Sequence, residues 1–328
     1  MRVLMIGGTK FIGRRITEEL TARGDDVTVV HRGQTEPDGL PGCRHLHADR
    51  RDFASLAAEV KSLAPDAVVD TMALSRADVD AVLPHLPEAR LVALSSVDVY
   101  RAFELEESPV SEVPVPVGEE SPVRHGRYPY RGVMPRFHDY EKLDVEPPYL
   151  DRGGAVLRLG LIYGEHDPQR REEFILRRVR AGRRRIPVGA GNWLISRCYV
   201  GDVASAVLAA IDCDAARGQI FNVVEPVCGT VLDWARQILA AAGHEAELVG
   251  GLPNDLVPED LELTKLYAQH ELFDSHKARD LLGWRPGEVE PGIAASVRWH
   301  LAHPPAEPSP DFSADDRALA AAPTQAPA

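Results

Sequence analysis

The stretch that most constrains the fold is MIGGTKFIG, residues 5–13, near the start of the chain. It joins an apolar run, RVLMI, to a segment whose apolar residues recur at helical spacing. Gly7, Gly8 and Gly13 allow a tight turn in which backbone N–H groups and the amino end of a helix face an anion. A strand, a glycine turn and a helix within a unit of about 30 residues predict a site for the paired phosphates of a dinucleotide.

The first half of the chain continues this alternation of strand-like and helix-like segments. Segments with helical spacing separate the apolar runs DVTVV, AVVDTMA and RLVALSS. Because these runs show no polar alternation, we expect both faces of the sheet to be covered. The pattern predicts an α/β fold of the Rossmann type, with a doubly wound parallel sheet and a smaller C-terminal substrate lobe.

The glycine turn resembles the fingerprint T-G-x-x-G-F-x-G of the extended short-chain dehydrogenases/reductases, the NAD-dependent epimerase/dehydratase family. Aligned on Phe11 and Gly13, Lys10 occupies the position of the middle family glycine. The variant GGTKFIG is similar to an atypical branch that includes chloroplast stem-loop-binding proteins. The resemblance implies coenzyme contacts from the residues of the turn: Gly7, Thr9, Lys10, Phe11, Ile12 and Gly13.

The end of the second predicted strand bears on the choice of coenzyme. NAD-preferring sites usually carry an acidic residue here, whereas this chain has HRG. Arg32 is suited to pair with a 2′-phosphate, so we expect NADP, with NAD as the alternative; a solvated loop arginine is the other interpretation. The segment HADRRD resembles the family's G-D-x-x-D, which implies that Asp49 accepts from the adenine amino group and Arg50 packs over the ring. Ala73, in AVVDTMALS, is implied to lie near the coenzyme.

The segment SSVDVY resembles the family's S-S-x-x-V-Y-G. This match puts Ser96 at the position of the catalytic serine or threonine. A hydroxyl there bonds the substrate's oxygen and steadies proton transfer. The other interpretation is a serine pair that only ends a strand.

The segment MPRFHDYEKLDVE raises a question of register. In the superfamily pattern Y-x-x-x-K, residues four apart share a helix face. Lys142 with Glu146 matches the family's K-x-x-x-E, but in a predicted helix over 134–148 Tyr140 lies roughly 200° around from Lys142. His138 shares the lysine's face. We therefore predict His138 and Lys142 as the catalytic pair and keep Tyr140 as a weaker candidate, more suited to packing.

Three interpretations of the proton-transfer group stay open. His138 acts as an unusual acid or base, or a tyrosine of the loop RYPYRG, Tyr128 or Tyr130, moves in, or the site binds coenzyme without redox chemistry. An ammonium beside His138 favours the neutral imidazole. A neutral imidazole suits a base better than the proton donor that ketone reduction needs.

The resemblance also implies a domain organisation. Residues 1–164 would mainly form the NAD(P)-binding Rossmann domain. Residues 165–302 would mainly form the substrate lobe, with residues of about 201–223 returning to the Rossmann domain. The last segment, 303–328, is rich in proline and alanine, and its low complexity predicts a disordered tail.

Eight arginines lie within residues 170–185, in a predicted helix over 169–182. Such a run is usually a solvated helix face, but it would also attract an anionic substrate or RNA phosphates. Ile195 stands where nucleotide-sugar enzymes often carry a diphosphate-binding arginine, so a nucleotide-sugar substrate is not supported.

These features predict an NAD(P)-dependent oxidoreductase or epimerase/dehydratase that acts on a small polar substrate, sugar-like or anionic. The alternative is a non-catalytic protein that binds NAD(P), or that binds RNA through the arginine-rich helix. Nucleic acid is the less expected partner, and a homodimer is one assembly that the sequence allows.

Composition and charge weigh against other classes of protein. A net charge of −13 and a pI of about 5.4 argue against a whole-molecule nucleic-acid or membrane-surface binder. The four cysteines are too widely spaced for a metal knuckle, so no metal site is predicted. They are typical of reduced thiols, which fits a cytoplasmic protein. No secretory signal is evident, and no apolar run approaches the roughly 18–20 residues of a membrane span.

Overall fold

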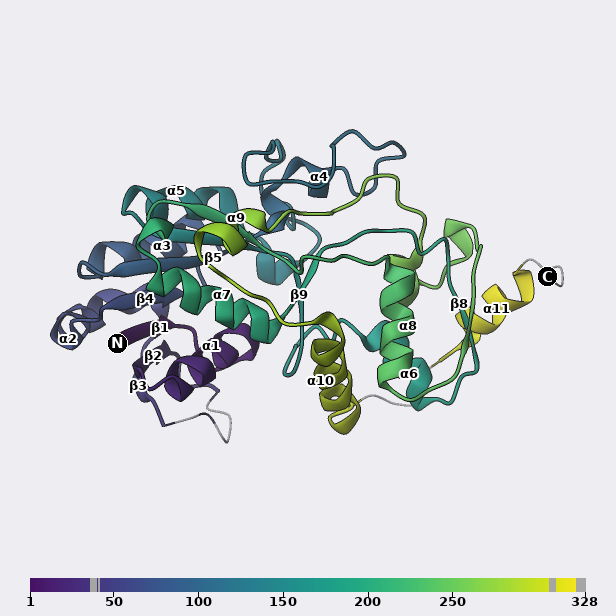
Figure 1. Ribbon diagram of the computed structural model, residues 1–328, viewed down its shortest axis with the longest axis horizontal. Helices are drawn as coiled ribbons and strands as arrows, with labels where there is room; N and C mark the ends of the chain where they lie inside the picture. Colours follow the sequence, from purple (N-terminus) through teal and green to yellow (C-terminus); the bar gives the residue numbers. More distant parts are fainter. Residues whose placement is uncertain (36–39, 41, 307–310, 323–328) are drawn as a thin grey trace.

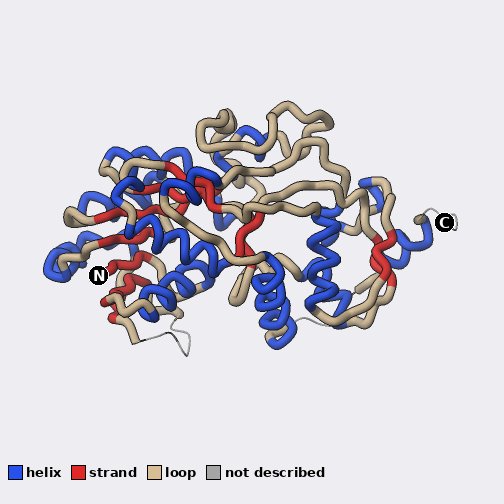
Figure 2. Tube along the Cα trace, viewed as in Figure 1, coloured by secondary structure: helices blue, strands red, loops and turns tan. Residues whose placement is uncertain are grey.

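The structure is a computed structural model that describes residues 1–35, 40, 42–306 and 311–322 (Figure 1). A sheet-based body contains the N-terminus, and a second lobe of helices and long loops lies beside it (Figure 2). None of the helices in these residues is long and apolar enough to cross a membrane.

A seven-stranded sheet forms the body, with every pairing parallel. Its strand order is β10-β6-β5-β4-β1-β2-β3, which confirms the predicted Rossmann-type fold. The strands are β1 (Arg2–Ile6), β2 (Asp26–His31), β3 (Arg44–His47), β4 (Ala67–Asp70), β5 (Arg90–Ser96), β6 (Ala155–Leu159) and β10 (Ile220–Val223). Their carboxyl ends lie at one edge, where α/β sheets bind ligands.

Helices cover both faces of this sheet. On one face lie α1 (Phe11–Ala22), α7 (Val200–Asp212) and α9 (His276–Leu281). On the other lie α2 (Ala57–Leu63), α3 (Arg76–Val82) and α5 (Lys142–Asp151). Alternate strand residues enter the two cores: Val29 packs on the α1 side and Val30 on the α3 side. The apolar strands predicted from the sequence are therefore buried on both faces.

The second lobe packs around the buried indole of Trp234. Its helices are α6 (Glu173–Arg180), α8 (Val231–Ala241), α10 (Val289–Ala302) and α11 (Ser313–Ala321). Two pairs of short parallel strands accompany them, namely β7 (Leu161–Tyr163) with β9 (Arg197–Tyr199), and β8 (Arg185–Pro187) with β11 (Glu247–Val249). The predicted domain boundaries stay a prediction, although α7 and β10 pack with the sheet.

Short helical segments complete the chain. They are α4 (Arg101–Glu104) and the 3₁₀ turns η1 (Arg50–Leu56), η2 (Leu83–His85), η3 (Val97–Val99), η4 (Pro135–Phe137), η5 (Asp214–Ala216), η6 (Asn254–Leu256) and η7 (Glu259–Thr264).

The helix predicted over 134–148 is wrong at its start. Only the 3₁₀ turn Pro135–Phe137 forms there, and α5 begins at Lys142. Glu141 stops an earlier start because its backbone is extended, with φ −157° and ψ 93°. The arginine-rich helix is likewise shorter than predicted, since α6 spans Glu173–Arg180 rather than 169–182.

The tail predicted to be disordered over 303–328 contains a helix, α11. Low complexity concealed two anchors in this segment: Ala318 packs in the core of the second lobe, and the carboxylate of Asp315 is buried. Arg178 of α6 donates to Asp315 through Nε at 2.8 Å and Nη2 at 2.6 Å. Residues 307–310 and 323–328 of this tail lie outside the described residues.

Arg178→Met is expected to lower the free energy of unfolding by about 3–5 kcal/mol, because it leaves the Asp315 carboxylate buried without its partner. Urea denaturation measures this change. The control is Arg236→Met, which breaks an exposed pair with Asp233 and is expected to change stability by at most about 1 kcal/mol. Equal unfolding midpoints for the two variants would show that the Arg178 pair does not anchor α11.

Candidate coenzyme-binding and catalytic site

The glycine turn brings the amino end of α1 close to the carboxyl edge of the sheet. Gly7 has a φ of +80°, and a Cβ on Gly13 would lie 2.3 Å from the carbonyl oxygen of Gly7. Lys10, in place of the family glycine, has a φ of −133°, an extended conformation open to any residue, and it is exposed. The first turn of α1 holds no acidic residue, so its N–H groups are left for an anion. This cradle fits the paired phosphates of NAD(P).

The remaining predicted residues of the turn surround this cradle. Thr9 is buried, and its Oγ1 lies 3.2 Å from Oγ1 of Thr35. Phe11 and Ile12 are half-buried against the core beneath α1. Their contacts with a coenzyme stay predictions.

The predicted adenosine contacts lie at the ends of the neighbouring strands. Arg32 follows β2 and is exposed, and Asp49 is exposed while its carboxylate caps the η1 turn. The guanidinium of Arg50 donates two hydrogen bonds to the fully buried Asp70, at 3.2 and 3.0 Å. The sequence did not predict this contact. The stacking of Arg50 on adenine stays a prediction. Ala73 is buried.

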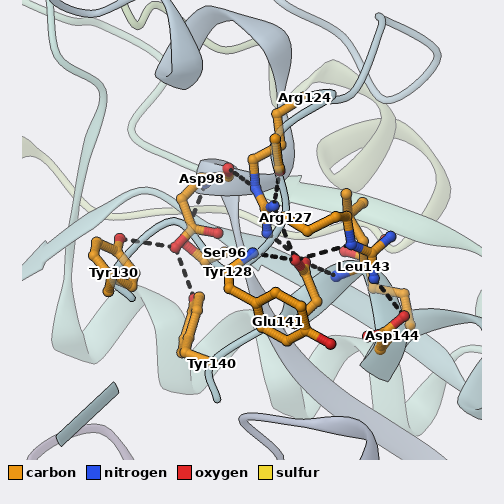
Figure 3. A network of polar contacts seen from close by, with 12 residues as sticks. Ser96, Asp98, Arg124, Arg127, Tyr128, Tyr130, Tyr140, Glu141, Leu143 and Asp144 are labelled. Carbon is orange, nitrogen blue, oxygen red and sulfur yellow. Dashed lines mark hydrogen bonds and ion pairs between the residues drawn. The ribbon is translucent and has the colours of Figure 1, made fainter. Parts of the chain in front are cut away.

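Asp98 is the centre of a polar cluster just beyond β5. Tyr140 donates to Oδ2 of Asp98 at 2.7 Å, and Tyr130 donates to the same oxygen at 3.0 Å (Figure 3). The Ser96 hydroxyl accepts from the Asp98 N–H at 3.2 Å and also interacts with the Tyr140 hydroxyl. Oδ1 of Asp98 is buried and has no hydrogen-bond partner among the described residues. The cluster therefore presents two phenols, a serine and a carboxylate at the end of one strand.

Lys142 lies under this cluster as the first residue of α5. The side chain is only 4% exposed, and Nζ donates to the carbonyl oxygens of Ala73 at 2.7 Å and Leu94 at 2.8 Å. Its ammonium is 5.7 Å from the centre of the Tyr140 ring. A carbonyl of the loop after β4 and a carbonyl within β5 thus hold the lysine in place beside Tyr140.

His138 does not share this site. Its side chain is 60% exposed, and its Nδ1 lies 2.8 Å from a carboxylate oxygen of Asp139. The predicted pairing of His138 with Lys142 is wrong in the structure, because residues 138–141 lie outside α5 and helical spacing does not apply to them. Tyr140, expected to pack on the other side, is the residue beside Lys142.

The loop tyrosines behave differently from one another. Tyr130 contacts Asp98 and so belongs to the cluster. The interpretation in which a loop tyrosine moves into the site needs such a position. The ring of Tyr128 instead lies under the guanidinium of Arg131, with 3.7 Å to its centroid.

Burial sets the protonation of the cluster. It raises the pKa of Tyr140 well above its ordinary value, and the Asp98 carboxylate raises it further. The pKa of Tyr130 is raised for the same two reasons. Burial also raises the pKa of Asp98 and lowers that of Lys142 to about 8, although Asp98 and other carboxylates partly oppose the change at the lysine. Both phenols are therefore protonated at neutral pH and act as donors.

A buried ion pair positions the segment that carries Tyr140. Arg124 pairs with both carboxylate oxygens of Glu141, at 3.0 Å for Nη1, and both side chains are buried (Figure 3). The same carboxylate accepts from the N–H of Tyr128 at 2.8 Å and of Leu143 at 3.1 Å. Sequence reasoning missed Asp98, Arg124 and Glu141. Of the three, Asp98 was the easiest to find from the sequence, because it is an acidic residue inside the apolar segment SSVDVY.

Charged side chains of the second lobe adjoin the cluster. Arg171 interacts electrostatically with Tyr130, and its buried Nε has no hydrogen-bond partner among the residues that the structure describes. Glu271 is 4% exposed with a similarly unpartnered Oε1, and burial and the Asp98 charge raise its pKa well above the ordinary value. Such groups are costly to bury unless a ligand or water supplies the missing hydrogen bond.

Most of the arginine-rich segment is neutralised by acidic residues. Arg177 and Arg178 pair with Asp260, and four further arginines of the segment pair with glutamates or aspartates: Arg170 and Arg180 with Glu173, Arg183 with Asp316, and Arg185 with Glu247. Arg184 donates to the carbonyl oxygen of Glu245. The segment is therefore not the free basic face that the RNA-binding alternative requires.

Part of the chain matches a family model, and known proteins resemble most of its length. Residues 3–86 match the model of the NAD dependent epimerase/dehydratase family. The chain is 26% identical to the chloroplast stem-loop binding protein of 41 kDa b of Arabidopsis thaliana, over 97% of this chain and 84% of that protein. It is 25% identical to a 3-diazoavenalumate denitrifying reductase of a Streptomyces species, over 87% of this chain and 96% of the relative.

Solved structures show the same fold over nearly the whole chain. A UDP-glucose-4-epimerase of Stenotrophomonas maltophila, with bound NAD and formylated UDP-arabinopyranose, superposes with a TM-score of 0.70 at 20% identity and covers 92% of this chain and 98% of its own. The Bordetella bronchiseptica enzyme WbmH, in complex with NAD⁺, gives 0.67 at 18% identity, with 92% and 98% covered. The family match is confined to residues 3–86, and the solved structures show that the rest of the chain shares the fold of these enzymes.

The buried Lys142 predicts a specific pH dependence of stability. Since its folded pKa of about 8 lies below the ordinary lysine value, the unfolded chain binds more protons between the two values, and stability rises with pH there. Relative to Lys142→Met, the wild type should gain about 2 kcal/mol of unfolding free energy from about pH 8 to about pH 10.

Urea titrations at a series of pH values measure the difference between the two proteins. Lys61→Met, which changes an exposed lysine on α2, is the control. A wild-type advantage over Lys142→Met that stays constant with pH would contradict the buried, destabilised ammonium.

Proposed function

We propose that the protein is an NADP-preferring oxidoreductase of the epimerase/dehydratase type that acts on a small polar substrate. The observation that carries this proposal is the convergence of Ser96, Asp98, Tyr140 and Lys142 at the carboxyl end of β5, beside the glycine turn. In this proposal residues 1–164 mainly hold the coenzyme, residues 165–302 mainly hold the substrate, and the substrate lies between them.

The coenzyme's place follows from the turn and the strand ends. The amides of the first turn of α1 hold the paired phosphates, with Gly7 and Gly13 allowing the close approach. Arg32, exposed at the end of β2, pairs with a 2′-phosphate. Bound there, NADP(H) supplies the hydride donor or acceptor. The solved relatives named above hold NAD, so the preference for NADP rests on Arg32 alone.

The chain's own residues handle the proton. Tyr140 is protonated at neutral pH and donates to a substrate oxygen, while the Ser96 hydroxyl holds that oxygen in place. Asp98 orients the phenols of Tyr140 and Tyr130 through one oxygen. The ammonium of Lys142 stabilises negative charge that develops on the phenol when its proton leaves. A neutral histidine would be a poor proton donor for ketone reduction, whereas the protonated phenol of Tyr140 can supply the proton.

Buried polar side chains of the second lobe indicate that the substrate is polar. Arg197, 2% exposed, stacks 4.8 Å from the centre of the Trp234 ring, and its Nε lacks a hydrogen-bond partner in the described part of the chain. Arg171 and Glu271 add an unpartnered donor and acceptor nearer Tyr130. A small molecule with an anionic group and hydroxyl groups satisfies all three.

The named relatives are divided between the two alternatives, so the choice between them depends on this chain's own side chains. One relative is a reductase by its printed name, and another is a stem-loop binding protein. In this chain the arginines that would contact RNA phosphates are mostly paired with acidic side chains. The polar cluster at β5, by contrast, places two phenols and a serine hydroxyl around one buried carboxylate.

Coenzyme binding tests the first part of the proposal. NADPH at 100 times its dissociation constant should add about 2.7 kcal/mol of stability in a thermal unfolding assay. Arg32→Ala should weaken NADPH by at least about tenfold, the scale of one lost charge-assisted contact, and leave NADH unchanged. Equal effects on both coenzymes would remove the NADP preference, and no stabilisation by either would remove the enzyme assignment.

Turnover tests the proton donor. In a panel of small polar aldehydes and ketones, NADPH consumption should fall by at least about 100-fold in Tyr140→Phe, the lower range for loss of a general acid. His138→Ala, which changes an exposed side chain, should stay within about twofold of wild type. Thermal shift with NADPH confirms that both variants still bind coenzyme. The reverse pattern of activities would make His138 the acid or base.

A further inference from the structure

Three histidines gather at an edge of the sheet away from the Asp98 cluster. His31 ends β2, and His45 and His47 belong to β3, the last strand of the sheet. In the parallel register His47 lies opposite His31, and His45 lies opposite Val29. Because side chains alternate along strands, all three imidazoles point to the same face of the sheet. The sheet itself brings them together, although the sequence separates His31 from the others.

The imidazoles are close enough to share one ion. Nε2 of His31 lies 2.8 Å from Nδ1 of His45, and the ring centres of His31 and His47 are 4.7 Å apart. One ligand atom from each residue lies within 4.8 Å of those from the other two. Nitrogens bound tetrahedrally to one zinc ion at about 2.0–2.1 Å stand roughly 3.4 Å apart. Small side-chain rotations therefore convert the cluster into a coordination site.

Hydrogen bonds define how the protons are placed in the cluster. The N–H of Gly33 donates to Nδ1 of His31 at 3.2 Å, so the proton of neutral His31 lies on Nε2 and is donated to Nδ1 of His45. His45 then carries its own proton on Nε2, 3.5 Å from Sγ of Cys43. The Nδ1 lone pair of His45 faces the cluster, and its outer N–H has an acceptor, as in metal-binding histidines.

We propose that His31, His45 and His47 form a binding site for one first-row transition-metal ion, of which Zn²⁺ is the best match. Three neutral imidazoles suit Zn²⁺, Co²⁺ or Ni²⁺ and disfavour Mg²⁺ and Ca²⁺, which prefer oxygen ligands. His47 is exposed, which gives an ion and a coordinating water access from solvent. This proposal departs from the sequence-based expectation of no metal, which rested on the spacing of cysteines.

The ion would take the place of the proton between His31 and His45. Coordination through Nε2 of His31 moves its proton to Nδ1, so the contact with the Gly33 N–H has to open. Gly33 has a φ of +71°, a glycine conformation that sits in a loop rather than in the sheet. The sheet positions of His45 and His47 stay fixed while this turn adjusts.

Zinc titration of the full chain, without a histidine tag and dialysed against chelator, tests the proposal. Calorimetry is expected to show one Zn²⁺ bound per chain at neutral pH, weaker binding as the pH falls through the histidine range, and no heat with Mg²⁺. Co²⁺ should give a visible spectrum of nitrogen ligation. The site is part of the protein's own fold, so coenzyme and substrate are not needed for this readout.

Variants locate the ion. His47→Gln and His45→Gln should each weaken Zn²⁺ by at least about tenfold, since even an outer partner of a metal ligand contributes that much. His276→Gln, which changes an exposed histidine outside the cluster, should bind Zn²⁺ like wild type. Metal-free thermal unfolding verifies that each variant is folded. No stoichiometric Zn²⁺ binding by the wild type, or full affinity in both cluster variants, would overturn the proposal.

Discussion

The carboxylate of Glu141 fixes the point at which α5 begins, and the arrangement of the catalytic cluster depends on that point. Fully buried, it accepts from the N–H of Leu143 and pairs with Arg124 of the preceding loop. The extended backbone of Glu141 breaks helical register just before Lys142. As a result Tyr140 turns toward the lysine, and His138 turns to solvent. A helix extended back over this segment would have given the opposite result.

Local determinants made the fold predictable from the sequence, and non-local ones hid part of the site. Gly7 and Gly13 satisfy steric requirements that any chain meets at such a turn, so their role was evident from spacing alone. The start of α5 depends on the ion pair between Arg124 and Glu141, which are 17 residues apart, and helical periodicity cannot reveal such a pair. The docking of α11 depends on Arg178, 137 residues from Asp315, so composition alone predicted disorder there.

Burial moves the two central groups of the site toward their neutral forms. It raises the pKa of Tyr140 and lowers that of Lys142, so the usual effect of a lysine on a catalytic tyrosine is outweighed in this chain. The carboxylate of Asp98 contributes in both directions, because it opposes ionisation of the phenol and favours the ammonium. The resting site therefore holds a phenolic proton ready for donation.

The distribution of charge separates the structural arginines from those available to a ligand. Arg178 is fully buried, but two aspartates satisfy it, and it connects α6 to η7 and α11. Arg197 is nearly as buried but has no ion pair among the described residues; its guanidinium lies over the Trp234 ring, and Nη1 is 3.5 Å from the carbonyl oxygen of Ile195. The charge nearest to it in effect is the buried Glu225 carboxylate, whose pKa the guanidinium lowers against the larger effect of burial. Arg178 therefore anchors a helix through two aspartates, whereas Arg197 keeps an Nε without a hydrogen-bond partner in the described part of the chain.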